Sequence, residues 1–214
     1  MNSCRGRLVA LEGTDGCGKT TQAGILAARL GAVLTREPGG TPLGECLRKL
    51  LLSSGGPAVG PAAEALLMLA SRAQHVADVV APALEAGKWV VTDRFSASTL
   101  AYQGYGRGLG LGELRLLTSW SSGGLWPDLN VLLVREGAGL GCAADHAPDR
   151  MEAEGSGFQD RVAAGFRELA AADPPRWAVV DGEGTVEAVA ARVEAAVVDR
   201  LGQLPPAGSP EPEL

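Results

Sequence analysis

The sequence predicts an α/β fold in which one five-stranded parallel sheet carries helices on both of its faces. Three observations support this prediction. Short apolar runs of strand length alternate with segments of helical length along most of the chain. The first run, Leu8–Leu11, is apolar throughout, as expected for a parallel strand that is covered on both sides. A chain of 214 residues with 46% apolar and 21% charged side chains is also sufficient for one globular domain.

The elements expected in the first half follow from apolar runs and from residues that start or stop helices. Gly31 is suited to end a helix, and Thr41 is suited to cap the next one. Pro82 is expected to bend a long helix, because proline has no N–H for the helical hydrogen bond. In order, we expect a strand at 8–11, a helix at 19–30, a strand at 32–35, a helix that follows Thr41 and ends at Leu52, a loop at 53–61, a helix at about 62–86 and a strand at 89–92.

The second half continues the alternation, with one irregular segment. Residues 135–157 show no clean periodicity and are expected to form a mobile lid. The Pro- and Glu-rich end, 204–214, is expected to be a disordered tail behind a single domain formed by residues 1–203. The remaining elements are expected as helical segments at 96–103 and 111–121, a strand at 129–134, a helix at 158–172, a strand at 177–180 and a helix at 186–201.

Charge and composition exclude several classes of function. The net charge of −6 argues against a broad surface for nucleic acid or anionic membrane. No apolar run has the length needed to span a bilayer, and no secretory signal precedes the strand pattern that begins after Arg7. The four cysteines show neither CxxC spacing nor nearby histidine pairs. We therefore expect a cytoplasmic protein with reduced thiols that binds neither membrane nor nucleic acid.

The strongest motif lies directly between the first strand and the first helix. Gly13–Thr20 fits the pattern G-x-x-x-x-G-K-[ST] of a P-loop, in which backbone N–H groups surround a phosphate at a helix N-terminus. Lys19 is expected to reach the β- and γ-phosphates of ATP, and the Thr20 hydroxyl to ligate Mg²⁺. The sequence therefore predicts a P-loop NTPase fold. The nucleotide-binding candidates are Gly13, Thr14, Asp15, Gly16, Cys17, Gly18, Lys19, Thr20 and Thr21.

The motif leaves open whether the chain is a kinase, an ATPase, a GTPase or a motor. The short length and the lack of an N-K-x-D motif, which reads guanine, weigh against a GTPase. Cys17 admits two interpretations: a redox switch, since helix N-termini lower thiol pKa values, or a small residue at an unconstrained position. We favour the second. His75 has no partner that the sequence identifies, and we expect it to be structural or solvated.

A second polar cluster follows the third predicted strand. Asp93 and Arg94 lie where that strand ends, at the edge of a parallel sheet that binds ligands. Asp93 can organise Mg²⁺ and its water, and Arg94 can bind a phosphate. A site for two phosphorylated substrates needs many cations, because the phosphates repel each other until they are neutralised. Candidates for this cationic cluster are Arg36, Arg48, Arg72, Arg107 and Arg150.

Further segments define a family pattern. They are T-R-E-P-G-G-T at 35–41, R-A-Q-H at 72–75, D-R-F-x-x-S-x-x-A-Y-Q-G at 93–104 and D-R-M-E at 149–152. Together with the P-loop, they make the chain resemble the bacterial thymidylate kinases, which are P-loop nucleoside monophosphate kinases, over roughly residues 5–201. The resemblance implies transfer of the ATP γ-phosphoryl group to dTMP, giving dTDP and ADP for dTTP synthesis. It also implies a homodimer, with ATP and dTMP as ligands and Mg²⁺ as cofactor.

The resemblance also assigns roles to single residues. Arg94, with Arg36 nearby, would hold the monophosphate, and Asp15 would lie near Mg²⁺ and the sugar 3′-hydroxyl. Tyr102 would stand where a 2′-hydroxyl clashes, and Arg72 would hydrogen-bond the thymine ring. The implied catalytic residues are Lys19, Arg94, Asp15 and Arg150; the metal site would contain Thr20, Asp93 and Asp15; and substrate would contact or depend on Arg36, Glu37, Arg48, Met68, Arg72, Arg94, Ser98, Thr99, Tyr102 and Gln103.

Two departures from the family pattern keep alternatives open. Met68 stands where the family has a phenylalanine that stacks on thymine, so the stacking should be weaker and another deoxynucleoside monophosphate is an alternative acceptor. Residues 135–157 hold only two arginines, Arg135 and Arg150, and the usual aspartate after the fourth strand is missing. Arg150 would then carry most of the lid's positive charge. We expect slow turnover or a site that is partly compensated, and a nucleotide-binding relative with weakened catalysis is the other alternative.

Overall fold

The computed structural model describes residues 5–53, 55–135, 150–151 and 154–202. The predicted tail and most of the predicted lid lie outside this part of the chain. No described helix is long and apolar enough to cross a membrane.

The five predicted strands form one parallel sheet, which confirms the fold class. The order across the sheet is β2-β3-β1-β4-β5, so the direction of winding changes beside β1. β1 and β3 are neighbours in register, with Leu11 opposite Asp93. Parallel sheets of this kind bind ligands at the carboxyl edge beside such a change. The strands are β1 (Leu8–Glu12), β2 (Val33–Arg36), β3 (Val90–Asp93), β4 (Leu129–Val134) and β5 (Trp177–Asp181).

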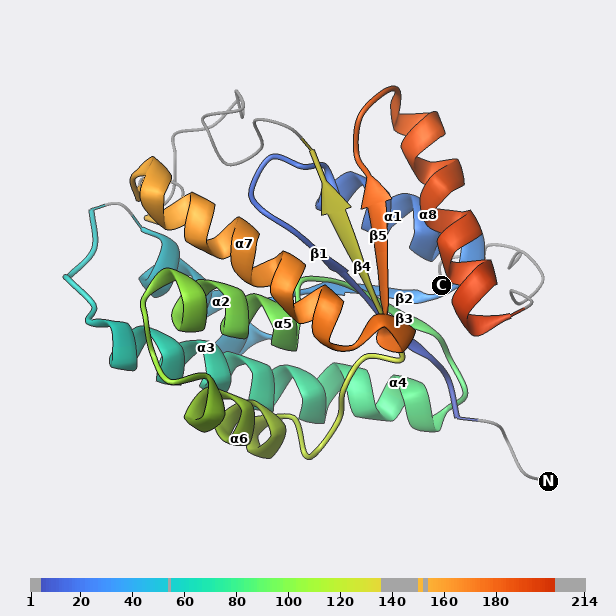
Figure 1. The fold of residues 1–214 in the computed structure, drawn as a ribbon. Coiled ribbons are helices and arrows are strands. Elements are labelled where there is room, and N and C mark those ends of the chain that lie inside the picture. The colour runs from blue at the N-terminus through green and yellow to red at the C-terminus, as the bar shows by residue number, and fades with distance from the viewer. Residues whose placement is uncertain (1–4, 54, 136–149, 152–153, 203–214) are drawn as a thin grey trace.

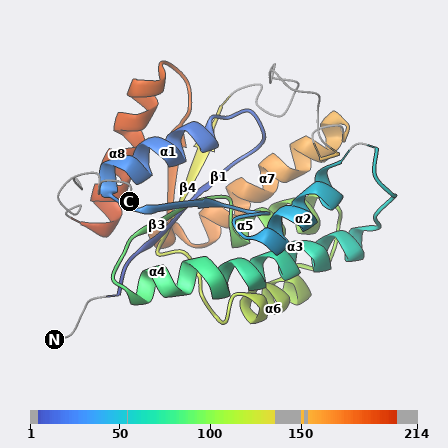
Figure 2. The ribbon, with the colours of Figure 1, turned by 180° about the vertical axis from the view of Figure 1, so that it is seen from behind.

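Helices cover both faces of the sheet (Figure 1). α1 (Lys19–Leu30) and α8 (Val186–Leu201) pack together on one face, and both views show them on the same side of the strands (Figures 1 and 2). The other face carries the remaining large helices, and α2 packs on α3 beside it. The large helices are α2 (Pro42–Leu52), α3 (Pro61–His75), α6 (Leu111–Ser121) and α7 (Ser156–Ala172). Two short elements complete the set: α5 (Ser96–Thr99) and the 3-10 turn η3 (Pro174–Arg176).

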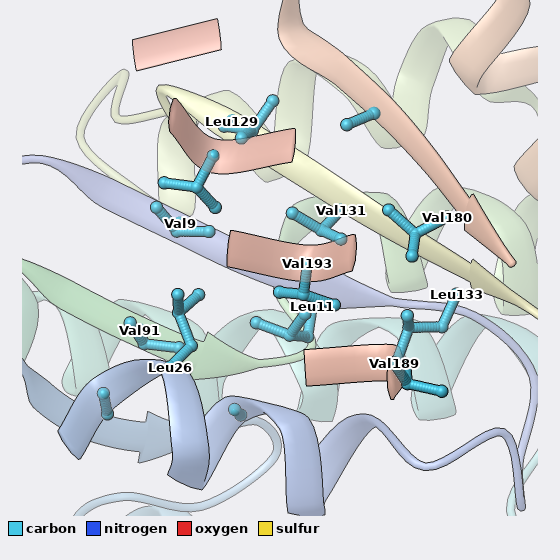
Figure 3. Packing of buried hydrophobic residues seen from close by; sticks show 14 of the residues in the cluster. Val9, Leu11, Leu26, Val91, Leu129, Val131, Leu133, Val180, Val189 and Val193 are labelled. Carbon is cyan, nitrogen blue, oxygen red and sulfur yellow. The ribbon is translucent and has the colours of Figure 1, made fainter. Parts of the chain in front are cut away.

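The apolar core explains why the strand sequences are hydrophobic without alternation. Alternate strand residues such as Val9 and Leu11 point towards α1 and α8, where they meet Leu26 and Val193 (Figure 3). The intervening residues, among them Leu8, point to the opposite face and pack under its helices. Because both faces are covered, every position of β1 is buried. This core fixes the strand ends that carry the site.

The long helix predicted at 62–86 is present, with an interruption before its proline. α3 is followed by a π-helical turn, η1 (Val76–Val80), and then by α4 (Ala81–Glu85). Pro82 offers no N–H to the carbonyl four residues earlier, and its ring crowds that carbonyl. A wider π turn directly before Pro82 relieves this conflict, so the irregularity appears one turn earlier than the bend expected at Pro82.

A second π-helical segment carries several predicted site residues. α5 continues as η2 (Leu100–Gly106), whereas the sequence predicted a helix ending at Gln103. The amide of Arg107 bonds to the carbonyl of Tyr102 five residues earlier. Segments of this type are uncommon and often mark functional sites, because the wider turn changes the directions of successive side chains.

Candidate active site

The loop between β1 and α1 has the backbone geometry that a phosphate site needs. Gly13 has a φ of 141°, and a Cβ there would lie 2.6 Å from the carbonyl oxygen of Leu133. Gly18, at the start of α1, has a φ of 93°. Both glycines are therefore required, because other residues would be strained at these angles and a side chain at Gly13 would clash. The Nζ of Lys19 bends back over this loop and donates to the carbonyl oxygen of Thr14 at 2.6 Å.

The side chain of Cys17 in this loop is buried. Its side chain is 3% exposed and belongs to the apolar core between the sheet, α1 and α8. Its sulfur also lies 3.6 Å from the Nζ of Lys19. A thiol buried in a core is poorly accessible to oxidants, so the structure favours the interpretation of Cys17 as a small packing residue over a redox switch.

Thr20 and Asp93 form the candidate metal site. Because β1 and β3 are paired, the end of β3 lies beside the start of α1, and the Thr20 hydroxyl donates to Asp93 Oδ2 at 2.5 Å. The other oxygen, Asp93 Oδ1, is buried and has no hydrogen-bond partner among the described residues. Mg²⁺ prefers oxygen ligands and often takes only one or two from the protein, with water and phosphate completing its shell. A hydroxyl and a carboxylate with an unpaired oxygen fit such an ion.

Arg94 is the centre of the polar cluster. It is the one non-glycine residue with positive φ, 69°, in the described chain, and such strained conformations are concentrated at functional sites. Its Nη1 donates to the carbonyl oxygen of Gly13 at 2.9 Å and to Ser98 Oγ at 3.1 Å. Its Nη2 donates to Asp15 Oδ1 at 2.5 Å and to the Tyr102 hydroxyl at 3.0 Å. The P-loop, β3 and η2 therefore meet at one guanidinium group.

The Arg94 cluster is held by complementary charge. The Tyr102 hydroxyl donates to Asp15 Oδ2 at 2.8 Å, so that Arg94, Asp15 and Tyr102 form a closed ring of hydrogen bonds. Burial acts to raise the pKa of Asp15, but the nearby Arg94 and Lys19 cations outweigh it and hold that pKa below its ordinary value. Asp15 is therefore a carboxylate at neutral pH, able to accept hydrogen bonds or to approach a cation.

Glu12 lies beneath this cluster. It is fully buried, and its carboxyl group accepts from the Phe95 amide at 2.9 Å and from Ser98 Oγ at 2.6 Å. Burial raises the pKa of Glu12 to about 7, against the opposing effects of Ser98 and Arg94. Because Ser98 also accepts a hydrogen bond from Arg94, Glu12 supports the Arg94 guanidinium indirectly.

Arg72 anchors a second buried network. Its Nε donates to Glu37 Oε2 at 2.8 Å and its Nη2 to the carbonyl oxygen of Phe95 at 3.0 Å. His75 lies between Glu37 Oε1, at 2.9 Å, and Thr35 Oγ1, at 2.6 Å. The remaining nitrogen, Arg72 Nη1, is buried and has no partner among the described residues. A buried N–H without an acceptor is costly, so this atom indicates a ligand that accepts a hydrogen bond.

The comparisons with known proteins agree on one family. The thymidylate kinase family model matches residues 11–193. This chain belongs to the thymidylate kinase family. A thymidylate kinase of Bifidobacterium longum (strain DJO10A) is 48% identical over 197 residues, which cover 88% of this chain and 96% of that protein. A thymidylate kinase of Cereibacter sphaeroides (strain ATCC 17029) is 46% identical over 214 residues, with 94% and 98% covered.

A solved structure supports the same assignment. The crystal structure of thymidylate kinase from Ehrlichia chaffeensis matches with a TM-score of 0.77 and 30% identity, and the match covers 90% of this chain and 99% of that one. The P-loop NTPase fold predicted from the sequence is therefore confirmed. As a member of the thymidylate kinase family, the chain is a nucleoside monophosphate kinase, a phosphotransferase that uses ATP.

In this thymidylate kinase family member, α3 and η2 bring together the residues expected to surround the base. Met68 is half-buried and packs against the apolar cluster that contains Tyr102. Thr99 and Gln103 are each 2% exposed, and Ser98 lies one turn away from Tyr102 on the same helical segment. The predicted substrate residues of α3, α5 and η2 are thus neighbours of the Arg72 and Arg94 networks.

The predicted arginines of the cationic cluster have hydrogen-bond partners of their own in the structure. Arg36 pairs with Glu45, with both side chains largely exposed, and Arg48 donates to the Pro38 carbonyl oxygen at 3.0 Å. Arg107 pairs with the buried carboxylate of Glu64, away from the P-loop contacts. These arginines thus have acidic or carbonyl partners from other segments, which sequence spacing alone does not identify, and their sharing of one phosphate site stays a prediction.

The described end of the lid places Arg150 beside the α2–α3 loop. Its Nη2 donates to the carbonyl oxygens of Ser53 at 3.2 Å and Pro57 at 2.8 Å. Its backbone amide bonds to the Leu52 carbonyl oxygen. Residues 136–149, on which the expectation of an arginine-poor lid rests in part, lie outside the described chain.

Three buried groups of the site were missed by the sequence reading. Glu12 appeared only as the end of a strand, Glu64 was one acid on a long helix, and His75 had no assigned partner. All three are ionisable residues at positions where the apolar pattern of the helix or strand predicts burial, and this combination could identify them from the sequence. That signal was available for Glu12, because the apolar run Leu8–Leu11 leads directly into it.

Proposed function

We propose that this chain transfers the γ-phosphoryl group of ATP to dTMP, producing dTDP and ADP in the synthesis of dTTP. The observation that carries the proposal is the 2.9 Å hydrogen bond from Arg94 to the Gly13 carbonyl oxygen. It joins the residue proposed to hold the acceptor phosphate to the loop that would hold the donor phosphates. Two phosphate sites so close suit in-line transfer between them.

Positioning and cations account for the chemistry. The dTMP phosphate is an anion near neutral pH and needs no strong general base. Lys19 would exchange its contact with the Thr14 carbonyl for the β- and γ-phosphates, and Arg94 would direct its guanidinium at the acceptor phosphate. Thr20, Asp93 and Asp15 would hold Mg²⁺, which neutralises phosphate charge. The unpaired oxygen of Asp93 supports this assignment.

Recognition of thymine would use the Arg72 network. Glu37 and His75 fix the guanidinium, and the unpartnered Nη1 can donate to a carbonyl oxygen of the base. Ser98, Thr99 and Gln103 would border the ring with Met68 against its face. Arg36 at the end of β2 and Arg48 on α2 would support the site from outside, where they contact Glu45 and the Pro38 carbonyl oxygen.

Tyr102 would exclude the ribonucleotide. Its ring is buried between Phe158 and Phe166, with centroid distances of 6.1 and 6.2 Å, and its hydroxyl is held by Asp15 and Arg94. A side chain fixed at both ends has little freedom to move aside for a 2′-hydroxyl group.

The lid would contribute Arg150 to the transferring group. In the structure this side chain contacts the carbonyl oxygens of Ser53 and Pro57, so it would have to exchange them for phosphate oxygens when substrates bind. An Arg150→Ala variant should lose kcat by about tenfold or more, as expected for removal of a cation from phosphoryl transfer. Unchanged turnover would remove Arg150 from the mechanism.

We further propose that the protein acts as a homodimer in the cytoplasm. Neighbouring helices α3 and α6 carry large apolar side chains at the surface: Leu66 is 58% exposed, Leu116 74% and Trp120 81%. Apolar groups gathered on adjacent helices favour contact with a second copy of the chain. The cytoplasmic location rests on the cysteine spacing in the sequence.

Arg94→Lys tests the proposed acceptor site. Lysine keeps the charge but loses the fork that binds a phosphate through two nitrogens. The KM for dTMP should rise by about tenfold or more, while the KM for ATP changes by less than about threefold. Arg29→Lys, which alters an exposed ion pair with Glu194 on the α1–α8 side, serves as the control. An equal loss of affinity for both substrates would contradict the assignment.

A further inference from the structure

Glu64 is a buried carboxylate that the proposed reaction does not use. It lies on α3 and is 2% exposed. Arg107 binds it through two nitrogens, with Nε 3.1 Å from Oε1 and Nη2 2.9 Å from Oε2. The Gln103 amide nitrogen, Nε2, donates to Oε1 at 3.0 Å. Both carboxyl oxygens of Glu64 therefore act as acceptors, for three N–H groups in all, two of them from a guanidinium.

The acceptor oxygens of Glu64 determine which end of the Gln103 amide faces this residue. A carboxylate can accept hydrogen bonds but cannot donate one, so only the NH2 end of Gln103 can turn towards it. The carbonyl oxygen of Gln103, Oε1, is then directed away from Glu64. The acceptor oxygens of Glu64 therefore determine which end of the Gln103 amide carries the NH2 group, although the O and N ends of such amides are otherwise difficult to distinguish.

The spacing of residues along α3 relates the orientation of the Gln103 amide to the choice between pyrimidine bases. Glu64, Met68 and Arg72 are spaced by four residues and form one row on the helix surface. One end of the row offers the buried, unpaired N–H of Arg72, and the other end controls the acceptor oxygen of Gln103. A pyrimidine with a carbonyl at position 4 and an N–H at position 3 matches this donor and acceptor. Cytosine presents an amino group and a bare ring nitrogen, and is mismatched at both.

We propose that Glu64 is a positioning residue that sets base specificity: it holds the Gln103 amide so that its oxygen accepts the ring N–H of thymine, and thereby rejects cytosine. The inference rests on the proposed base site around Arg72 and Gln103. Glu64 itself does not touch the substrate.

Arg107 makes the arrangement stable. A buried carboxylate without a cation would be costly, and Arg107 supplies that cation to Glu64. Arg107 is in turn held by Glu154 at 2.6 Å and lies over the Phe158 ring at 4.7 Å. The network thus joins α3, η2 and the start of α7 around one carboxylate.

The test compares kcat/KM for dTMP and for dCMP in wild type and Glu64→Gln. The variant keeps the shape of the side chain, but its amide can face Gln103 with either end. The ratio of dTMP to dCMP activity should fall by about tenfold or more, because both orientations of Gln103 become available. A structural role alone would lower both activities alike and leave the ratio unchanged, which would overturn the proposal.

A double-mutant cycle shows whether Glu64 acts through Gln103. Gln103→Leu removes the acceptor and should lower the ratio to a similar extent. Glu64→Gln added to Gln103→Leu should produce no further loss of the ratio; a further loss would contradict the coupling. If Glu64→Gln does not fold, the test rests on Gln103→Leu, which leaves the Glu64–Arg107 pair intact. An unchanged ratio of dTMP to dCMP activity in that variant overturns the proposal.

Glu154→Gln is the matched control. It removes the other acidic partner of Arg107 but leaves the contact between Glu64 and Gln103. The ratio should stay at the wild-type value, and a fall as large as that of Glu64→Gln would assign the effect to Arg107 instead. The wild-type preference is measured first: if wild type prefers dCMP, the proposed thymine site is wrong, which is a different outcome from failure of the Glu64 inference.

Discussion

At the scale of single residues, the types of the site groups were predictable but their partners were not. The P-loop motif identified Lys19 and Thr20 because the pattern fixes both type and spacing. The contact from Arg94 to Asp15 joins residues 79 positions apart, and that from Arg72 to Glu37 joins residues 35 apart. Such pairs depend on which strands become neighbours, which the local sequence does not specify.

The raised pKa of Glu12 predicts how the free energy of unfolding depends on pH. Its pKa rises from 4.5 in the reference state to about 7 in the folded chain, so the folded state binds the proton more tightly than the unfolded state. The contribution of Glu12 to the free energy of unfolding is therefore fully present below about pH 4.5 and is lost as the pH rises through 7. Between pH 5 and 8 the loss should be about 2–3 kcal/mol.

Urea unfolding of wild type and Glu12→Gln across pH 5–8 measures this loss. Subtracting the two free energies removes the titration of both histidines and of all other shared groups. Asp15 and Glu37 have lowered pKa values, so their contribution is lost towards acid, outside this range. The wild type should lose stability relative to Glu12→Gln as the pH rises. A constant difference would show that Glu12 does not titrate in this range.

At the scale of elements, regular segments were predictable and irregular ones were not. All five strands and the helices at 19–30, 111–121 and 186–201 follow from the sequence, because one period of apolar residues runs through each. The π-helical segments η1 and η2 differ from an α-helix because their backbone hydrogen bonds span five residues instead of four, and no residue type specifies them. Because η2 carries Tyr102 and Gln103, the directions of these side chains needed the structure.

Met68 on α3 leads to a prediction about this element. A thioether packs on a base more weakly than an aromatic ring, so Met68→Phe should strengthen stacking and lower the KM for dTMP by about threefold to tenfold. The KM for ATP should not change. Steady-state kinetics with each substrate varied in turn measures both constants. A higher KM for dTMP in a folded variant would mean that Met68 is a core residue that phenylalanine overpacks.

At the scale of the whole molecule, strand order determines where the site forms. Alternation of strands and helices predicted a parallel sheet, and the placement of β1 beside β3 brings the P-loop, Thr20 and Asp93 to one edge. The exact order β2-β3-β1-β4-β5 does not follow from alternation alone, because several right-handed orders satisfy the same pattern.

The apolar surface of α3 and α6 leads to a prediction about assembly. Trp120→Glu should convert the proposed homodimer into a monomer, because a charge in an apolar interface loses its hydration without gaining a partner. Light scattering after size exclusion should give twice 21.9 kDa for wild type and 21.9 kDa for the variant. Val198→Glu, an exposed position on α8, is the control and should remain dimeric. A monomeric wild type would contradict the proposal.

The choice of acceptor by the wild-type enzyme tests whether this chain is a kinase for dTMP. ADP formation is measured with ATP and Mg²⁺ and with dTMP, dUMP, dCMP or dGMP as the acceptor. The Arg72 donor and the Gln103 acceptor predict that kcat/KM is highest for dTMP, lower for dUMP, and lower by a factor of about a hundred or more for dCMP and dGMP. Comparable activity with dCMP, or ADP formation that does not depend on any acceptor, would contradict the account.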